Sequence, residues 1–391
     1  MTENALTHLP GLAALATKLR GDADRAQALP AELVAELTAA GCFRMVTPVS
    51  HGGDELPLPD VIRVVAALSR ADAAVGWTVG QAALAQVVFA YLPPPTFDTL
   101  YADGPDVVGA GATAPKGRAM RDPEGGWRIS GQWPFVTGCG HARWFFGQCA
   151  VVGDDPAATG GADGAGPPPM RLAVLPMDSV TVVDSWHVLG LRGTGSNDVK
   201  VRRRSCPDEW TCSVVGSRPA LDRPGFRTPL LEYGAFLVAA AMVGIAWGAV
   251  DDVVALAGAG KRPAFSPAAL ADQPLFQDRA GEAYLAATSA EALLTAQTEA
   301  AWARAARPGS PASLVERAAL RGTAAEVATL ARRAVDTAYQ LGGGSSIYDS
   351  CGLQQRMRDL HTATQHAVAS RQPYQVLGSA LVDRPNRSLA Y

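Results

Sequence analysis

Three regions that differ in the spacing of hydrophobic and polar residues follow one another along the chain. Residues 1–104 place apolar residues three and four positions apart, which is typical of amphipathic helices. Residues 105–217 alternate apolar and polar positions between glycines, as strands joined by tight turns do. Residues 218–391 contain long alanine-rich periodic runs, which favour a helical bundle. The pattern therefore predicts a helical domain, a β domain and a second helical domain with these boundaries.

The third region is long enough for four helices with short connections. Glycine and proline interrupt its periodicity at residues 258–260 and 307–311. Its most apolar part, residues 236–250, ends at Asp251 and is too short and too rich in small residues for a membrane span, so we expect a buried helix. The four predicted helices cover about 230–257, 267–306, 311–341 and 353–371.

The composition narrows the class of protein. The chain has 391 residues, of which 48% are hydrophobic, and a net charge of −3. The near-neutral charge argues against a nucleic-acid-binding surface, and the N-terminus lacks the basic and apolar segments of a signal peptide. Six cysteines without a CxxC motif or metal-ligand spacing fit a reduced, cytoplasmic compartment. Residues 153–169 are of low complexity and are predicted to form a surface loop.

The stretch from residue 125 to 152 combines the clearest strand pattern with candidate chemistry. Trp127, Ile129 and Trp133 alternate with polar residues and glycines. The segment Phe135-Val136-Thr137-Gly138 then places an aromatic ring beside a hydroxyl and bare backbone, which suits a flat, hydrogen-bonding ring system. The pattern alone equally describes an ordinary hairpin with core tryptophans, and aromatic stripes are more often core. Trp77, in an apolar helix, is likewise read as a core residue or as a neighbour of a substrate pocket.

A glycine-rich segment follows at residues 189–198. Its glycines, with Thr194 and Ser196, offer exposed backbone amides and two hydroxyls that can approach an anion or a ring edge closely. The chain has neither a GxGxxG motif after a strand nor a GxxxxGK[ST] motif, so it predicts neither a dinucleotide-binding Rossmann site nor a P-loop.

A third cluster lies near the C-terminus, after the glycines at 342–344. In a helix that restarts near Leu353, Arg358, His361 and Gln365 share one face, and His366 is offset from His361 by about 140°. A lone helix histidine is more often structural than catalytic. The spacing also differs from the HExxH zinc motif, so we expect no metal site.

These three segments together resemble the acyl-CoA dehydrogenase superfamily. The similarity is strongest to its branch of two-component flavin-dependent monooxygenases, of the 4-hydroxyphenylacetate and steroid-ring hydroxylase type. It rests on the aromatic-x-Thr segment at Phe135, on Gly-x-Arg-Gly-Thr-Gly-Ser up to Ser196, and on Gln-Arg-x-Arg-Asp-x-His-x-Ala-x-x-His up to His366, which is close to the signature of these oxygenases. The resemblance implies an α+β fold with an N-terminal helical domain, a middle antiparallel β-barrel or sandwich and a C-terminal four-helix bundle.

The resemblance also implies roles for individual residues. Phe135 would lie against the flavin ring, and the hydroxyl of Thr137 would bond the flavin N5. His366 would stand over the flavin and stabilise its hydroperoxide, with His361 in support. His141 would polarise or deprotonate a phenolic substrate, or be structural. The remaining cofactor-binding residues implied are Thr113 on a flavin-facing strand, Gly138, the closing loop of Gly193, Thr194, Gly195 and Ser196, and Gly342 and Gly343 at the phosphate or adenine end.

The activity implied is that of an oxygenase component. Reduced FMN or FAD, supplied by a separate flavin reductase, would react with O2, and the resulting hydroperoxide would hydroxylate a small aromatic, phenolic or natural-product substrate. A homotetramer is expected. Three alternatives stay open at this stage: an acyl-CoA dehydrogenase with Asp349 as its base, a member that oxidises nitrogen or sulfur, and a non-catalytic flavin-binding homologue.

Overall fold

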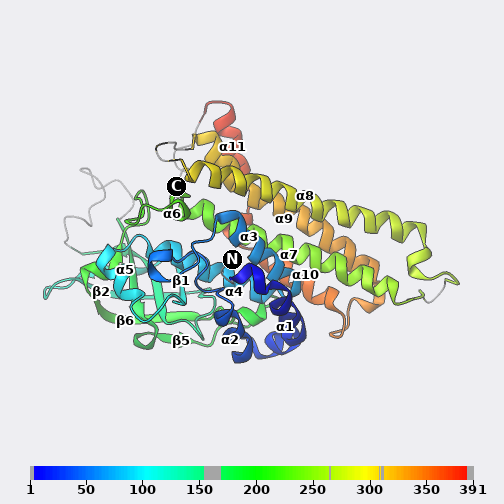
Figure 1. The fold of residues 1–391 in the computed structure, drawn as a ribbon, viewed down its shortest axis with the longest axis horizontal. Coiled ribbons are helices and arrows are strands. Elements are labelled where there is room, and N and C mark those ends of the chain that lie inside the picture. Colours follow the sequence, from blue (N-terminus) through cyan, green and yellow to red (C-terminus); the bar gives the residue numbers. More distant parts are fainter. Residues whose placement is uncertain (1–3, 154–168, 264–265, 308, 310–311, 385–391) are drawn as a thin grey trace.

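The structure is a computed structural model that describes residues 4–153, 169–263, 266–307, 309 and 312–384. Most of the predicted loop at 153–169 lies outside the described residues. As Figure 1 shows, the strands lie at one end of the molecule together with α5, the long helices α7, α8 and α9 extend to the other end, and helices α1 to α4 pack where the two parts meet. The elements follow the three predicted regions in order, and the division into three domains stays a prediction.

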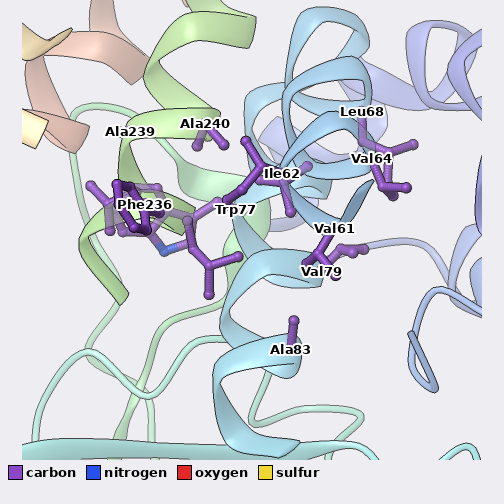
Figure 2. Packing of buried hydrophobic residues seen from close by; sticks show 14 of the residues in the cluster. Val61, Ile62, Val64, Leu68, Trp77, Val79, Ala83, Phe236, Ala239 and Ala240 are labelled. Atoms are coloured by element: carbon purple, nitrogen blue, oxygen red, sulfur yellow. The ribbon is translucent and has the colours of Figure 1, made fainter. Parts of the chain in front are cut away.

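The N-terminal region is helical, as its periodicity indicates. Helix α4 is apolar on every side and is almost wholly buried, because it lies between α3, α7 and the first strand. Asp72 caps this helix by accepting a hydrogen bond from the amide of Ala74 at 2.9 Å. Figure 2 shows Trp77 of α4 packed with Phe236 of α7 and Ile62 of α3. The helices are α1 (Ala5–Ala26), α2 (Ala31–Ala39), α3 (Leu58–Ala71), α4 (Ala73–Phe89) and α5 (Pro94–Leu100).

The middle region forms one seven-stranded sheet with the order β5-β6-β2-β1-β3-β4-β7. The predicted antiparallel arrangement needs one correction, because β1 and β3 pair in parallel. Strand β2 forms a hairpin with β1, and the chain then crosses the start of β1 to reach its other edge. The strands are β1 (Gly109–Arg121), β2 (Trp127–Trp133), β3 (Trp144–Val151), β4 (Met170–Pro176), β5 (Thr181–Val183), β6 (Asp198–Cys206) and β7 (Thr211–Cys212).

The C-terminal region is a bundle in which α9 packs against both α7 and α8, and α10 packs against α7 and α9. Helix α7 is long and apolar enough to cross a membrane by length and composition, but 94% of its most apolar window is buried inside the protein. It is thus the buried core helix that the sequence predicts. The helices are α6 (Pro224–Arg227), α7 (Leu230–Gly258), α8 (Pro274–Ala305), α9 (Leu314–Gly342), α10 (Gly352–Ala363) and α11 (Gln372–Leu381).

The predicted fourth helix over 353–371 is wrong beyond Ala363. There α10 ends, and a turn and a short 3-10 helix, Ala367–Ala369, lead to α11. Side chains compete for the last helical carbonyls, since Thr364 Oγ1 and Gln365 Nε2 both donate to the carbonyl oxygen of His361, at 3.1 and 3.3 Å. His366 therefore lies in a turn, and the helical offset predicted for it does not apply.

Candidate active site

The two glycine-containing segments singled out in the β region are bonded to each other along their length. The connection from β2 to β3, residues 134–143, meets the segment 189–198 before β6. The amide of Val136 donates to the carbonyl of Asn197 at 3.1 Å, and the amide of Gly138 donates to the carbonyl of Thr194 at 3.0 Å. These backbone bonds fix the position of Thr137, which lies between them.

The hydroxyl of Thr137 is part of a buried chain of hydrogen bonds. It receives the indole N–H of Trp77 at 3.3 Å and lies 2.9 Å from the hydroxyl of Ser196. The Ser196 hydroxyl lies 2.7 Å from that of Thr194, which donates to the carbonyl of Leu191 at 2.8 Å. Thr137, Thr194 and Ser196 are all buried. The chain thus joins helix α4 to both loops through side chains alone.

Trp77 also contacts His366, the second histidine of the C-terminal cluster. Its ring lies edge-on to the ring of His366, with centroids 5.8 Å apart. Thr137 and His366, which are far apart in sequence, are therefore both in contact with one indole. The structure confirms Trp77 as a core residue, and its place beside a substrate pocket stays a prediction. Its role could have been suspected from the sequence, because a buried indole N–H needs a partner.

His366 is held in a defined tautomer. Its Nδ1 accepts the amide N–H of Val368 at 3.4 Å, which leaves the proton of the neutral ring on Nε2. Desolvation by the surrounding chain lowers the pKa of His366 below its ordinary value, although the residue keeps an open side to solvent. The ring is thus exposed at its outer side, where the neutral Nε2–H can donate a hydrogen bond to a bound molecule.

His361 has a different environment. Its Nε2 lies 2.8 Å from Oδ1 of Asp336 on α9, so it ties α10 to the neighbouring helix of the bundle. Among the described residues, no contact links it to Thr137 or Trp77. The supporting role predicted for His361 stays a prediction, and the geometry makes it a support of the helix that precedes His366.

Phe135 combines backbone strain with exposure. Its φ is +64°, a left-handed conformation that a phenylalanine rarely adopts, and 69% of the residue is exposed. The ring of Trp186 stands edge-on to that of Phe135, at a centroid distance of 6.2 Å. Strain of this kind is kept where the surrounding structure imposes it, often at a binding site. An aromatic face is therefore presented to solvent two residues before Thr137.

A cavity of about 390 Å3 opens beside this loop. His141 lines it, and its Nε2 is buried without a hydrogen-bond partner among the described residues. Burial lowers the pKa of His141, so the ring is neutral and can accept or donate one hydrogen bond to a molecule in the cavity. The other lining residues are Gln27, Ala28, Leu29, Ala31, Val34, Ala35, Gly138, Gly140, Thr194, Gly195 and Asn197.

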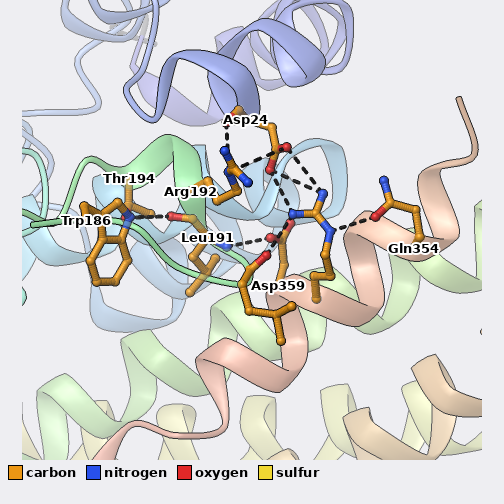
Figure 3. Close-up of polar contacts among 9 residues, drawn as sticks. Asp24, Trp186, Leu191, Arg192, Thr194, Gln354 and Asp359 are labelled. Carbon is orange, nitrogen blue, oxygen red and sulfur yellow. Dashed lines mark hydrogen bonds and ion pairs between the residues drawn. The ribbon is translucent and has the colours of Figure 1, made fainter. Parts of the chain in front are cut away.

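Helices α1 and α10 anchor the segment 189–198 from outside, as Figure 3 shows. The buried carboxylate of Asp359 accepts the amide of Leu191 at 2.6 Å. Arg358 donates to the carbonyl of Leu189 at 2.8 Å, and Arg192 donates to the carbonyl of Asp24 at 3.2 Å. Asp359 was not predicted as a positioning residue, although this acidic residue lies only two positions before His361 in the sequence.

Gly193 and Thr113 are two further residues that the family resemblance assigned to the cofactor. Gly193 packs against α1 and α4, since an added Cβ would lie 3.0 Å from Ala23 and from Ala74. Thr113 is exposed on β1, at the irregularity between Ala112 and Gly117.

The C-terminal glycine cluster, Gly342 and Gly343, lies near a second cavity and not at the one lined by His141. Gly342 ends α9 and Gly343 begins a 3-10 turn, near this second cavity of about 430 Å3 lined by Ser345, Tyr348 and their neighbours. Asp349 of the same loop is exposed. Within the part of the chain that the structure describes, no group of three His, Cys, Asp or Glu residues could hold a metal ion.

Comparison with known proteins places this geometry in context. Residues 236–371 match the family described as acyl-CoA dehydrogenase, C-terminal domain. The chain is 31% identical to indole-3-acetate monooxygenase of Pseudomonas putida over 96% of its length and 94% of that protein. It is 26% identical to the oxygenase subunit HsaA of a flavin-dependent monooxygenase from Rhodococcus jostii, over 87% and 88% of the two chains. The structure of XiaF from Streptomyces in complex with FADH2 and glycerol superposes with a TM-score of 0.88 at 25% identity, over 97% of this chain and 95% of that one.

Proposed function

Because the chain belongs to the flavin-dependent monooxygenases that have the acyl-CoA dehydrogenase fold, we propose that it is an oxygenase component that hydroxylates a small aromatic compound. The predicted family and fold class are confirmed, as is the expectation that the cofactor is reduced flavin and the co-substrate O2. Enzymes of this kind receive their flavin from a separate reductase. The observation that carries the proposal is the contact of Trp77 with both Thr137 and His366.

The residues at the site fit a flavin. The exposed, strained ring of Phe135 offers a face for stacking, and the buried hydroxyl of Thr137 retains an unused lone pair beside it. Bound reduced flavin supplies the activation of O2 and the transfer of one oxygen atom to the substrate. Thr137 would hold the flavin ring at N5, and the loop of Gly193, Thr194, Gly195 and Ser196 would close over it.

The C-terminal glycines and Thr113 of strand β1 are assigned to the cofactor on the basis of the sequence match. Gly342 and Gly343 would contact its phosphate or adenine end, and Thr113 on β1 would face the ring system. These assignments rest on the match of the sequence to the family motif. They name contacts that can be checked one residue at a time.

His366 would act as a neutral hydrogen-bond donor near the reacting oxygen. The bond from Val368 to Nδ1 keeps the proton on Nε2, and the lowered pKa keeps the ring uncharged at neutral pH. A donor that is already fixed in orientation needs no reorganisation when charge develops on a nearby atom. Loss of this donor would release oxygen as free peroxide instead of transferring it to the substrate.

The substrate would occupy the cavity beside His141. The unpaired Nε2 of this neutral ring can accept the proton of a phenol or an indole N–H, and Leu29 and Val34 supply apolar wall. Indole-3-acetate, named for the Pseudomonas relative, belongs to this class of compound. A planar molecule with one donor group toward His141 is therefore the substrate class that we propose.

The assembled protein is proposed to be a homotetramer in the cytoplasm. Leu275, Tyr284 and Leu285 are more than half exposed on α8, which lies on the outside of the bundle. Burial against further copies would cover such exposed apolar side chains. Sedimentation equilibrium should give four times the chain mass of 40.6 kDa; a monomer at micromolar concentration would refute this assignment.

The cytoplasmic location is supported by the cysteines. Five of them are buried and free, which fits a reducing compartment.

The reaction can be tested without the reductase. Chemically reduced FAD or FMN is bound under argon, and the complex is mixed with 18O2 and a panel of indoles, phenols, sulfides and amines. We expect one 18O atom in an aromatic product and little free peroxide. His366→Ala should convert most of that product into peroxide, whereas His187→Ala, at an exposed histidine that lies 3.5 Å from Asp184, should change nothing. Labelled sulfoxide or N-oxide alone would change the substrate class, and absence of any labelled product would refute the proposal.

A further inference from the structure

The buried hydroxyls beside Thr137 have a fixed donor direction. A carbonyl oxygen can only accept, so the 2.8 Å contact between Thr194 Oγ1 and the carbonyl of Leu191 uses the single proton of the Thr194 hydroxyl. Thr194 must therefore accept in its other bond. Its partner there, at 2.7 Å, is the hydroxyl of Ser196.

The donor direction of the Thr194 hydroxyl determines that of Ser196, which in turn determines that of Thr137. Ser196 donates its only proton to Thr194, so at its 2.9 Å contact with Thr137 it is the acceptor. Thr137 consequently donates its proton to Ser196. At its other side Thr137 receives the indole N–H of Trp77, which can only donate. With its proton used and one lone pair occupied, the Thr137 hydroxyl presents one remaining lone pair and no donor.

We propose that this ordered chain makes Thr137 an obligate acceptor and thereby selects reduced over oxidised flavin. Reduced flavin carries a hydrogen on N5, which Thr137 can accept, whereas N5 of oxidised flavin is itself an acceptor and would face the lone pair of Thr137. The specificity-determining residues are Ser196 and Thr194, which act through Thr137 and touch no reacting atom. This inference rests on the proposed function for the identity of the ligand.

The consequence is an exchange of flavin driven by its redox state. The protein would take up the reduced form from solution and release the oxidised form after turnover, since the N5 contact is favourable only before oxidation. Two buried acceptors facing each other without a proton weaken binding by roughly ten-fold to a hundred-fold. A preference of that order is enough for the oxidised form to leave when the reduced form arrives.

Binding constants measure this preference directly. Reduced and oxidised FAD and FMN are titrated into the intact protein under argon by calorimetry, and the ratio of the two Kd values is compared among variants. Thr194→Val removes the carbonyl-linked acceptor, which frees Ser196 to donate toward Thr137 and frees the Thr137 proton for oxidised N5. We expect the ratio to fall at least five-fold, mainly through tighter binding of oxidised flavin.

A second variant and a matched control distinguish a specific change in flavin preference from a general loss of structure. Ser196→Ala removes the acceptor of the Thr137 proton and should lower the ratio in the same way. Thr78→Val changes a buried threonine of α4 whose hydroxyl has no partner among the described residues, and it should leave the ratio unchanged. Equal weakening of both flavin forms in Thr194→Val and Ser196→Ala, or an unchanged ratio, would overturn the proposal while leaving the oxygenase function intact. Failure of the wild-type protein to bind either form would overturn both.

Discussion

Individual residues at this site serve packing and chemistry at once. Trp77 fills the space between α4, α7 and α3 with its ring while its N–H fixes the orientation of the Thr137 hydroxyl (Figure 2). His366 also has two roles, because its Nδ1 accepts the amide of Val368 in the turn after α10 and its Nε2–H can donate to a ligand. Such dual roles cannot be read from hydrophobic spacing, which records only that a position is buried.

Phe135 offers a test at the scale of one residue. Phe135→Gly removes the left-handed strain of a φ of +64° but also removes the exposed ring. We expect the free energy of unfolding to stay within about 1 kcal/mol of wild type, since relieved strain offsets the freedom of glycine in the unfolded chain. Reduced-flavin affinity should fall by roughly ten-fold, because stacking is lost. Phe135→Tyr keeps the ring and should retain affinity, and equal affinity in all three proteins would exclude a stacking role.

Among the elements, the connection from β2 to β3 and the segment before β6 form the site because the sheet order forces them together. The connection must cross the start of β1, and there it meets α4 and the glycine-rich segment. Helix α10 then holds that segment through Arg358 and Asp359 (Figure 3). The site is therefore assembled from loops whose positions depend on helices of both helical regions.

Close contact between the glycine-rich segment and α10 can be tested by a methyl group. In Gly190→Ala the new Cβ would lie 2.2 Å from the carbonyl oxygen of Arg358, which is backbone and cannot rotate away. We expect a loss of stability of roughly 2 kcal/mol, seen as a lower Tm, together with weaker flavin binding. Gly344→Ala meets no atom within 4 Å and is the matched control. A Gly190→Ala protein as stable as this control would show that the segment does not rest on α10.

The buried carboxyl of Asp359 predicts how stability depends on pH. Burial raises its pKa from 3.8 to about 7, and burial likewise raises the pKa of Asp72 to about 6. Between about pH 4 and pH 7 the folded protein therefore binds more protons than the unfolded chain. This contribution is complete below pH 4 and is lost as the pH rises through 7.

The Tm should accordingly fall between about pH 4 and about pH 7, with Asp359 accounting for roughly 3 kcal/mol of the change. Asp359→Asn keeps an acceptor for the amide of Leu191 but does not titrate, so its Tm should vary less over the same range. A pH dependence equal to that of the wild type would assign the effect to other groups. Differential scanning calorimetry of both proteins in matched buffers supplies the comparison.

At the scale of the whole molecule, the features that could be predicted from the sequence are those in which burial imposes a regular spacing of apolar residues. The three regions and the buried helix α7 follow from apolar spacing, because each element must turn its apolar side inward. The parallel pairing of β1 with β3 was not predictable, since it depends on which edge the chain returns to. The early end of α10 was missed because two polar side chains, at 364 and 365, capture the last carbonyl.

The candidate site was predictable in part for a similar reason. Thr137 and His366 were identified through family motifs, which encode the chemistry of each residue but not the space between them. Trp77 lies in an uninterrupted apolar run, so nothing in its neighbours marks it as the residue that joins the two. The directional hydroxyl chain depends on distances among four side chains and one carbonyl, which only the folded protein defines.

An anaerobic crystal structure of the protein with reduced flavin tests the central claim most directly. We predict N5 at about 3 Å from Oγ1 of Thr137, the ring beside Phe135, and the His366 side chain over the same ring. A flavin bound elsewhere, or one whose N5 lies beyond hydrogen-bond distance from Thr137 with His366 turned away, would contradict the account.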